Sequence, residues 1–293
     1  MRKRIDTSIL LIMVLFLVWG IGYIYTQEYH GDFTTDITYK PYVYRALLPT
    51  LAWIMQSVLR VSSSTSMQGF ILLFSGGMLL SLYYLYACFY GKGPRAIVYS
   101  FVTSCLVFFV ASFPPHVYDI PTVTLFSLSL LLLQAHKWNY FWILFPVVCF
   151  NRETSILLVA IFAWYAWERG MKPKEVVFWS IIGVGIDVAI RILLTTLFQA
   201  YPGDVVQFNF YHNADVYLDN PYIFLITLFS FLAVLNVVWG RWNHIPSLMR
   251  ISFLVMLPSL ILLYLLFGVA LELRVFLEVV PVLTFIGMIP LEY

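Results

Sequence analysis

Charged side chains are scarce in this chain, and their scarcity excludes an ordinary water-soluble protein. Aspartate, glutamate, lysine and arginine make up 11% of the 293 residues, whereas hydrophobic residues make up 61%. A soluble domain carries about 25% charged residues, which keep its surface wetted. Because a chain of this composition cannot cover itself with polar groups, we expect lipid to be its solvent.

Motifs of soluble enzymes are absent as well. The sequence holds no Walker A motif and no His-Glu-x-x-His, so a nucleotide-hydrolysing or zinc-protease role has no support, and no basic soluble patch suggests nucleic acid. The three cysteines, Cys88, Cys105 and Cys149, lie in apolar runs without zinc or redox spacing and are interpreted as small hydrophobic residues. No linker or clear repeat divides the chain, which predicts a single transmembrane domain over residues 1–293.

Long apolar runs are what the sequence has instead. An α-helix needs about 20 apolar residues to cross the hydrocarbon core of a bilayer. By this measure the sequence predicts an all-α, polytopic bundle of about nine or ten membrane helices. The predicted segments are residues 7–26, 68–90, 96–113, 120–136, 140–150 with 154–167, 176–199, 221–240, 251–270 and 275–291.

Two of these segments need a choice between alternatives. The run after Met1 is too long for the hydrophobic region of a signal peptide and no small-x-small cleavage site follows it, so we expect an uncleaved membrane helix. Residues 140–150 and 154–167 are each short, and both outer flanks are basic. We therefore expect two short helices that meet near Asn151-Arg152-Glu153 rather than one kinked span.

The charges indicate an orientation. If the segments alternate, eleven of the seventeen lysines and arginines fall on one side, together with the short loops. Cytoplasmic loops are enriched in these residues, so we expect a multi-pass protein of the cell membrane with both termini in the cytoplasm. Nine of the fifteen acids fall on the other side, where residues 27–67 and 200–220 form two long outer loops. Polar chemistry is therefore expected on the extracytoplasmic face.

The first outer loop contains two features of interest. Residues 45–60 are apolar but too short to span, with an arginine at each end, and are predicted to form an interfacial helix. Earlier in the loop, Asp32 and Asp36 follow His30 closely. A partly desolvated carboxylate can take a proton from a hydroxyl, and such groups with an imidazole can hold a divalent cation. The alternative is a solvated loop with helix caps.

Two further clusters follow on the outer side. Asp119, close to His116, can cap the helix that begins near Pro121 and can also belong to a site. Arg152 stands beside Glu153, and an arginine at this depth is expected to face the bundle interior or a watery cavity. Its planar guanidinium suits a phosphate; the alternative is a structural ion pair with Asp119 or Glu272.

The last helix carries a related pattern. Glu272 and Arg274 precede it, and Glu278 lies four residues beyond the arginine. A helical pair between Arg274 and Glu278 is one interpretation, and a place for Arg274 in the same outer cavity as Arg152 is the other.

Two features are less specific. His212 lies among aromatic residues in the 200–220 loop, and aromatic rings suit both sugar faces and the membrane interface. Asp187 and Arg191 stand four residues apart within a span and are expected to neutralise each other, with an ion pathway as the alternative.

In their order along the chain, these pieces resemble the GT-C superfamily of membrane glycosyltransferases. The resemblance lies in the acidic loop after the first helix, in Tyr-x-Tyr-Arg-x-Leu-Leu-Pro at residues 42–49, and in an acid that enters a Leu-rich helix at Asp119. It continues in Arg-Glu-Thr-Ser at residues 152–155 and Glu-x-Arg-x-Phe at 272–276. The chain departs from better-known members because neither outer loop holds an Asp-x-Asp pair.

The resemblance implies an inverting transfer of a sugar from a polyprenyl-phosphate donor to an acceptor on the extracytoplasmic face. It implies Asp36 or Asp32 as the general base, and arginines that hold the phosphate leaving group. A magnesium or manganese ion and partner membrane proteins are left open, and membrane lipids are expected neighbours. The residues implied to bind substrate are Arg152, Arg274, Asp119, Glu153, Glu272, His116, Arg45 and His212.

Two other functions remain. A protein of the same fold can bind polyprenyl phosphate, or help an assembly, without catalysis. A lipid or solute transporter is the third possibility, but it predicts a polar lane across the membrane and an inverted repeat, and neither is evident beyond Asp187 and Arg191.

Overall fold

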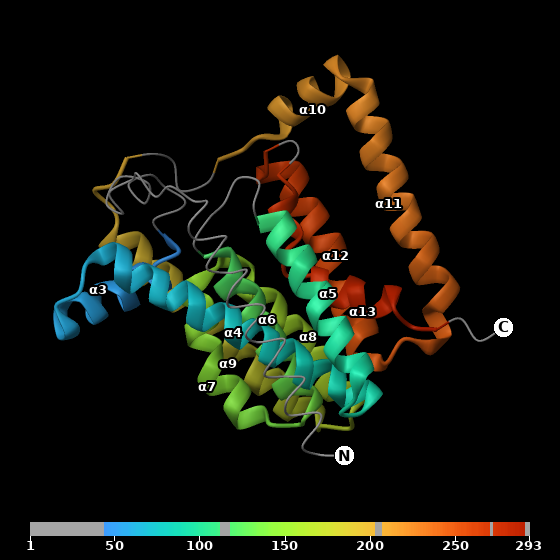
Figure 1. Ribbon diagram of the computed structural model, residues 1–293, viewed down its shortest axis with the longest axis horizontal. Coiled ribbons are helices and arrows are strands. Elements are labelled where there is room, and N and C mark those ends of the chain that lie inside the picture. Colours follow the sequence, from blue (N-terminus) through green and yellow to red (C-terminus); the bar gives the residue numbers. More distant parts are fainter. Residues whose placement is uncertain (1–43, 112–117, 203–206, 270–271, 291–293) are drawn as a thin grey trace.

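The computed structural model describes residues 44–111, 118–202, 207–269 and 272–290, and these form helices and turns without a β-strand (Figure 1). The predicted all-α architecture is confirmed. The α-helices are α3 (Leu47–Leu59), α4 (Ser63–Tyr90), α5 (Pro94–Ala111), α6 (Asp119–Gln134), α7 (Trp138–Asn151), α8 (Ile156–Glu168), α9 (Pro173–Leu197), α10 (Phe210–Asp219), α11 (Pro221–Arg241), α12 (Ser247–Phe267) and α13 (Val280–Gly287). Three 3₁₀-helices join them, namely η2 (Glu153–Ser155), η3 (Trp242–His244) and η4 (Leu273–Phe276).

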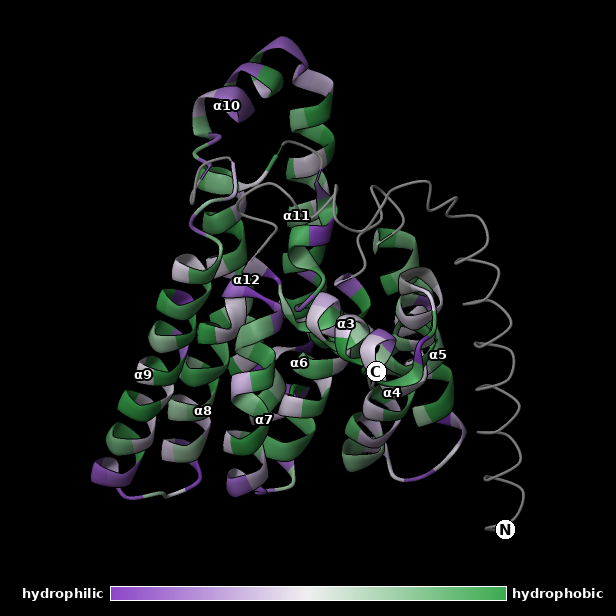
Figure 2. Cartoon of the chain, turned by 90° about the vertical axis from the view of Figure 1, so that its left-hand side faces the viewer, coloured by the Kyte–Doolittle hydropathy of each residue, from purple (hydrophilic) through white to green (hydrophobic). Residues whose placement is uncertain are grey.

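Five of the described helices are long and apolar enough to cross a membrane. Figure 2 shows hydrophobic residues along the length of the bundle. The structure thus supports a membrane protein, and the count of nine or ten membrane helices stays a prediction because residues 7–26 lie outside the described residues. The five spans are Thr65–Tyr90, Pro94–Ala111, Pro173–Leu197, Pro221–His244 and Ser247–Phe267.

The predicted pair of short helices is confirmed as an antiparallel hairpin. α7 ends at Asn151, η2 makes the turn, and α8 begins at Ile156. The rings of Phe141 and Phe162 stack at 5.7 Å, and Trp138 lies 6.2 Å from Tyr165, so the start of α7 lies beside the second half of α8. The chain therefore returns to the side it came from.

The last predicted span, residues 275–291, is wrong. The structure has η4, a turn, and then α13, which is only eight residues long. Pro281 stands in the first turn of α13, where its missing backbone N–H costs no helical hydrogen bond, and the residues before it form a turn and η4. The charged residues just before it, Arg274 and Glu278, are buried and belong to a polar cluster instead of a lipid-facing helix.

The short turns of the bundle gather at one end, which we call the basic end. The turns from α4 to α5, α6 to α7 and α8 to α9 lie side by side there, at the bottom of Figure 2. The turn from α11 to α12 lies there too, because Glu168 at the end of α8 accepts a hydrogen bond from Ser247 and pairs with Arg250 at 3.9 Å. Eight of the lysines and arginines lie in or beside these four turns, namely Lys92, Arg95, Lys137, Arg169, Lys172, Lys174, Arg241 and Arg250.

Helix length differs between the centre and the walls of the bundle. At 1.5 Å per residue, α6, α7 and α8 rise only about 20–24 Å, which is less than the roughly 30 Å hydrocarbon core. α4, α9 and α12 rise about 32–42 Å by the same measure. Since all of these begin or end at the basic end, α6, α7 and α8 stop short of the far ends of the longer helices.

Two helices lie outside this central group. α3, the predicted interfacial helix, extends sideways from the bundle in Figure 1, with Trp53 and Val58 exposed. α11 stands away from the rest of the bundle and is joined over its top by α10. α10 is held to the end of α12, because the Asn213 amide donates to the Gly268 carbonyl at 2.9 Å and the Tyr217 and Tyr264 hydroxyls lie 2.6 Å apart.

Candidate functional site

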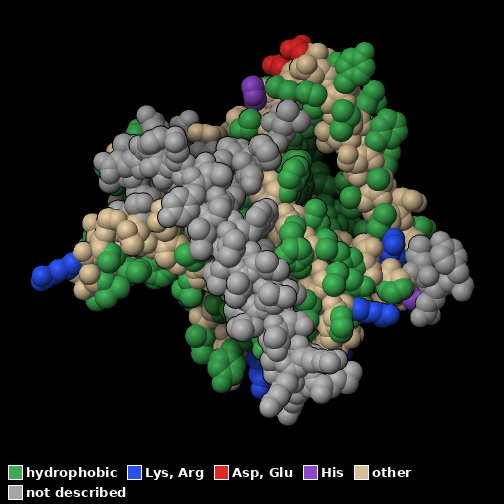
Figure 3. Space-filling view, in the orientation of Figure 1, with side chains coloured by type: hydrophobic (Ala, Val, Ile, Leu, Met, Phe, Trp, Pro, Cys, Tyr) green, Lys and Arg blue, Asp and Glu red, His purple; other side chains and the backbone are tan. Residues whose placement is uncertain are grey.

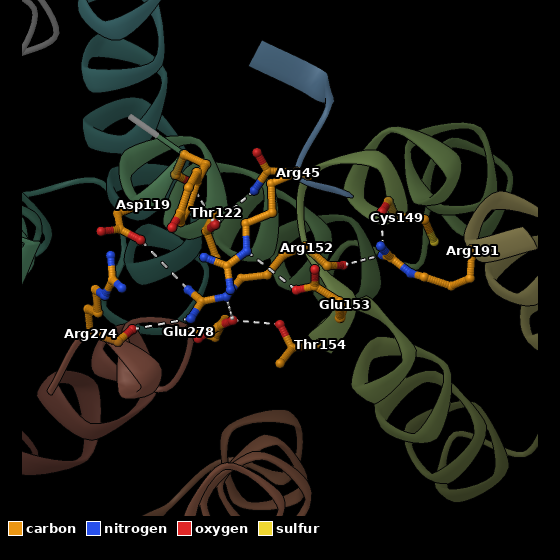
Figure 4. Close-up of polar contacts among 12 residues, drawn as sticks. Arg45, Asp119, Thr122, Cys149, Arg152, Glu153, Thr154, Arg191, Arg274 and Glu278 are labelled. Atoms are coloured by element: carbon orange, nitrogen blue, oxygen red, sulfur yellow. Dashed lines mark hydrogen bonds and ion pairs between the residues drawn. The ribbon is translucent and has the colours of Figure 1, made fainter. Parts of the chain in front are cut away.

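Charged side chains from distant parts of the chain meet at the ends of α6, α7 and α8 that lie away from the basic end, and Figure 4 shows their contacts. The positions span more than two hundred residues of sequence, so only the tertiary structure brings them together. We call this group the charged cluster. Its members are Arg45 before α3, Asp119 at the start of α6, Arg152 and Glu153 at the turn between α7 and α8, and Glu272, Arg274 and Glu278 around η4.

Arg152 is the centre of the cluster. Its side chain is 5% exposed, and its Nε lies 3.1 Å from Oε1 of the fully buried Glu278. Its Nη1 lies 4.0 Å from Oδ1 of Asp119, and its Nη2 donates to the backbone carbonyl of Arg274 at 3.5 Å. Thr154 donates to the same Glu278 oxygen at 2.6 Å. A buried guanidinium requires such partners, because leaving its charge unpaired in a low-dielectric interior costs on the order of several kcal/mol of folding free energy.

Asp119 is buried but incompletely bonded. Within the described residues, neither of its carboxylate oxygens accepts a hydrogen bond, and the Nη1 atom of Arg152 donates none. Asn151 donates to Thr122 at 2.7 Å beside them, while its own side-chain oxygen accepts no hydrogen bond there. Arg152 is thus the nearest cation to a carboxylate that has no hydrogen bond of its own there.

Arg45 and Glu153 form the more open side of the cluster. Nε of Arg45 lies 3.5 Å from Oε2 of Glu153, whose side chain is 39% exposed, and the Arg45 guanidinium lies 4.3 Å from the centre of the Tyr118 ring. Desolvation opposes ionisation of Glu153, but the nearby guanidinium groups of Arg45 and Arg191 outweigh it and hold the pKa of that carboxyl below its usual value. Glu153 is therefore a carboxylate at neutral pH.

Arg274 and Glu272 form a third ion pair. Nε of Arg274 donates to Oε1 of Glu272 at 2.5 Å, and its Nη2 contacts the same oxygen. The other Glu272 oxygen accepts from the backbone N–H of Val269 at 3.2 Å, which fixes this pair to the end of α12. The expected helical pair of Arg274 with Glu278 assumed α-helical spacing. Because residues 273–276 form a 3₁₀-helix, Glu278 pairs with Arg152 and Arg274 pairs with Glu272.

Arg191 supports the turn that carries Arg152. Its Nη2 donates to the backbone carbonyls of Cys149 and Arg152, at 2.5 and 2.8 Å. Its Nε lies 3.9 Å from Asp187, which confirms the predicted neutralising pair, and Asp187 also accepts from Ser155 at 2.8 Å. Backbone carbonyls freed by a helix break at membrane depth need such donors. Asp187 and Arg191 thus position the turn.

The predicted site residues divide into three groups. The structure brings six of them into the cluster: Arg45, Asp119, Arg152, Glu153, Glu272 and Arg274. It does not bring His212 there, because this residue is exposed on α10, and Figure 3 shows acidic and histidine side chains at the top of the molecule, where α10 lies. Asp32, Asp36 and His116 lie outside the described residues.

Glu278 was not predicted as a site residue. It was interpreted as a partner within the last span, yet it is the closest counter-charge of Arg152. The signal that could have identified it is its isolation in an apolar run, since acids in membrane segments almost always face a polar interior. Thr122, Asn151 and Thr154 carried no comparable signal.

Chemically, the cluster offers three guanidinium groups and four carboxylates at one end of an apolar helical bundle. Planar guanidinium groups suit phosphate oxygens, and buried carboxylates suit hydroxyl donors. Within the described ranges, no three His, Cys, Asp or Glu side chains gather into a group that could hold an ion.

Comparison of the whole chain with models of protein families, with curated proteins and with solved structures finds no match in any of the three.

Proposed function

We propose that this chain is a membrane glycosyltransferase of the GT-C type. It moves a sugar from a polyprenyl-phosphate donor to an acceptor on the extracytoplasmic face. The observation that carries the proposal is the charged cluster. Arg45, Arg152 and Arg274 come from segments far apart in sequence, yet all meet at the end of the bundle opposite its basic turns.

The depth of the cluster also supports a lipid-linked substrate. The turn at Arg152 lies below the membrane surface because α7 and α8 are too short to span. Irregular backbone at membrane depth occurs where it is buried in protein or lines a watery cavity. The phosphate of a polyprenyl lipid is attached to a chain within the hydrocarbon, so arginines close to this membrane surface lie within its reach.

The ion pairs suggest how a phosphate enters. Glu153 and Glu272 are 39% and 16% exposed, whereas Asp119 and Glu278 are fully buried. A phosphate competes with the two exposed acids for Arg45 and Arg274, and Glu278 keeps Arg152 oriented. The guanidinium groups then stabilise the charge that develops on the leaving phosphate.

The proton of the acceptor hydroxyl goes to Asp36 or Asp32 in this proposal. A positioned general base contributes about 10²- to 10⁴-fold to a rate. Asp119, with two buried oxygens that accept no hydrogen bond within the described residues, orients a hydroxyl of the substrate. The eight cations of the basic end support the proposed orientation, in which the cluster lies outside and both termini lie in the cytoplasm.

The test is turnover of lipid-linked sugars by the purified chain in nanodiscs, with mass analysis of the products. Asp36→Asn or Asp32→Asn is expected to reduce turnover by about 10²- to 10⁴-fold, with the fold kept. Asp215→Asn is the matched control, because Asp215 is an exposed acid of α10 and should leave turnover unchanged. Full activity in both Asp32 and Asp36 variants would reject the base assignment.

A second function is favoured by one observation, the pairing of every arginine in the cluster with a carboxylate. A protein that only binds polyprenyl phosphate needs the arginines and no base. It would retain the lipid phosphate, lose that retention in Arg274→Gln, and transfer no sugar. Sugar transfer that depends on an outer-loop aspartate excludes this alternative.

A further inference from the structure

Of the five long apolar helices, α11 buries the smallest share of its residues against the rest of the structure. Only 6% of its 18-residue apolar window is buried inside the structure, whereas the other four range from 22% to 50%. Its contact with the bundle runs along one narrow face, where Val238 is buried and Val234 and Phe231 pack against the core. Figure 1 shows the helix apart from the rest, held at its two ends.

A polar side chain lies on the opposite face. Asn236 stands two residues from both Val234 and Val238, which places it about 200° around the helix from each of them. Its side chain is exposed, and it makes no hydrogen bond within the part of the chain that the structure describes. α11 ends at Arg241, five residues on, so Asn236 lies about 7.5 Å inside that end of the apolar helix.

An outward amide at this depth is unfavourable in lipid. The hydrocarbon offers no hydrogen-bond partner, and polar side chains of membrane helices therefore turn toward protein or water. Two small residues share the face: Gly240 stands four residues after Asn236, and Ala233 three residues before it. Small residues let two helix backbones approach closely, and asparagine then forms hydrogen bonds between the helices.

We propose that the face of α11 formed by Ala233, Asn236 and Gly240 binds the same face of a second copy of this chain. A carboxamide both donates and accepts, so one Asn236 satisfies another across a two-fold axis. The two Asn236 side chains of such a pair therefore need no other hydrogen-bonding group. The face lies away from the charged cluster, so each protomer keeps its own site.

The test is the dimer fraction of the full-length chain in lipid vesicles, measured by energy transfer between labelled copies over a range of protein-to-lipid ratios. Wild type is expected to dimerise. Asn236→Leu should weaken dimerisation about tenfold, and Gly240→Leu at least as much. Leu235→Val is the matched control, because Leu235 is also exposed on α11 but lies about 100° around the helix from Asn236, on the side away from Ala233 and Gly240; it should leave the dimer unchanged.

A separate measurement does not depend on weakening the interface. Ala233→Cys should form an intermolecular disulfide on mild oxidation, whereas the parent chain with Cys88, Cys105 and Cys149 should not. Unfolding of each variant in detergent checks that it folds. A wild-type chain that stays monomeric at every lipid ratio would overturn the proposal. So would a dimer that Asn236→Leu and Gly240→Leu leave intact, or one that Ala233→Cys fails to crosslink.

Discussion

Replacing Glu278 by glutamine tests the centre of the charged cluster most directly. The change keeps the size of the side chain and an oxygen that can accept from Thr154, but it removes the charge 3.1 Å from Nε of Arg152. Breaking a buried ion pair by removing one charge costs about 3–5 kcal/mol. Because Asp119 remains 4.0 Å from Arg152 as a weaker partner, we expect the lower end, about 3 kcal/mol.

Variants of two other acids provide a comparison for this loss of stability. Glu272 is 16% exposed in its pair with Arg274, so Glu272→Gln should cost about 1–2 kcal/mol. Glu175 pairs with Lys172 at 3.9 Å, where the two side chains are 55% and 83% exposed. Water screens this last pair, so Glu175→Gln should cost below about 0.5 kcal/mol.

The assay is reversible unfolding of the purified chain in mixed micelles at pH 8, followed by circular dichroism. The expected order of destabilisation is Glu278→Gln, then Glu272→Gln, then Glu175→Gln. A double variant of Glu278→Gln with Arg152→Gln should show a coupling free energy of about 1–3 kcal/mol. If Glu278→Gln costs no more than Glu175→Gln, the buried pair does not exist and the charged cluster is wrong.

A further prediction concerns packing. Gly183 of α9 packs so closely that an added Cβ would lie 2.8 Å from Trp142 and 2.9 Å from Val159, so Gly183→Ala should destabilise the fold by about 1–3 kcal/mol. An added Cβ at Gly185 meets nothing within 4 Å, so Gly185→Ala should not destabilise the fold, and thermal unfolding of the two variants compares them.

Much of the helical architecture followed from local pattern. The segments that became α4, α5, α9, α11 and α12 are apolar runs of membrane length, and no tertiary contact is needed to recognise them. The turn near Arg152 was predictable because two short runs had basic flanks on the same side. The last span failed because hydropathy does not register the turn and η4 before α13 or the demand of Arg152 for a buried acid.

Six of the predicted binding residues met in one cluster, but their pairing was not predictable. Arg152 and Glu278 are separated by more than a hundred residues, and no local spacing relates them. The proposed pair of Arg274 with Glu278 rested on α-helical periodicity that the backbone does not follow there. His212 has the right chemistry for a site, yet the contacts of Asn213 and Tyr217 with α12 hold α10 elsewhere.

The sequence by itself determined that this chain folds as helices in lipid, because apolar runs and scarce charge leave the backbone no other way to satisfy its hydrogen bonds. It also determined which ends of those helices are basic. Only the tertiary structure decided which acid neutralises which arginine, since a buried charge takes the nearest counter-charge in space and not in sequence. It likewise left Asn236 facing outward, because the short contact face of α11 turns that amide away from the bundle.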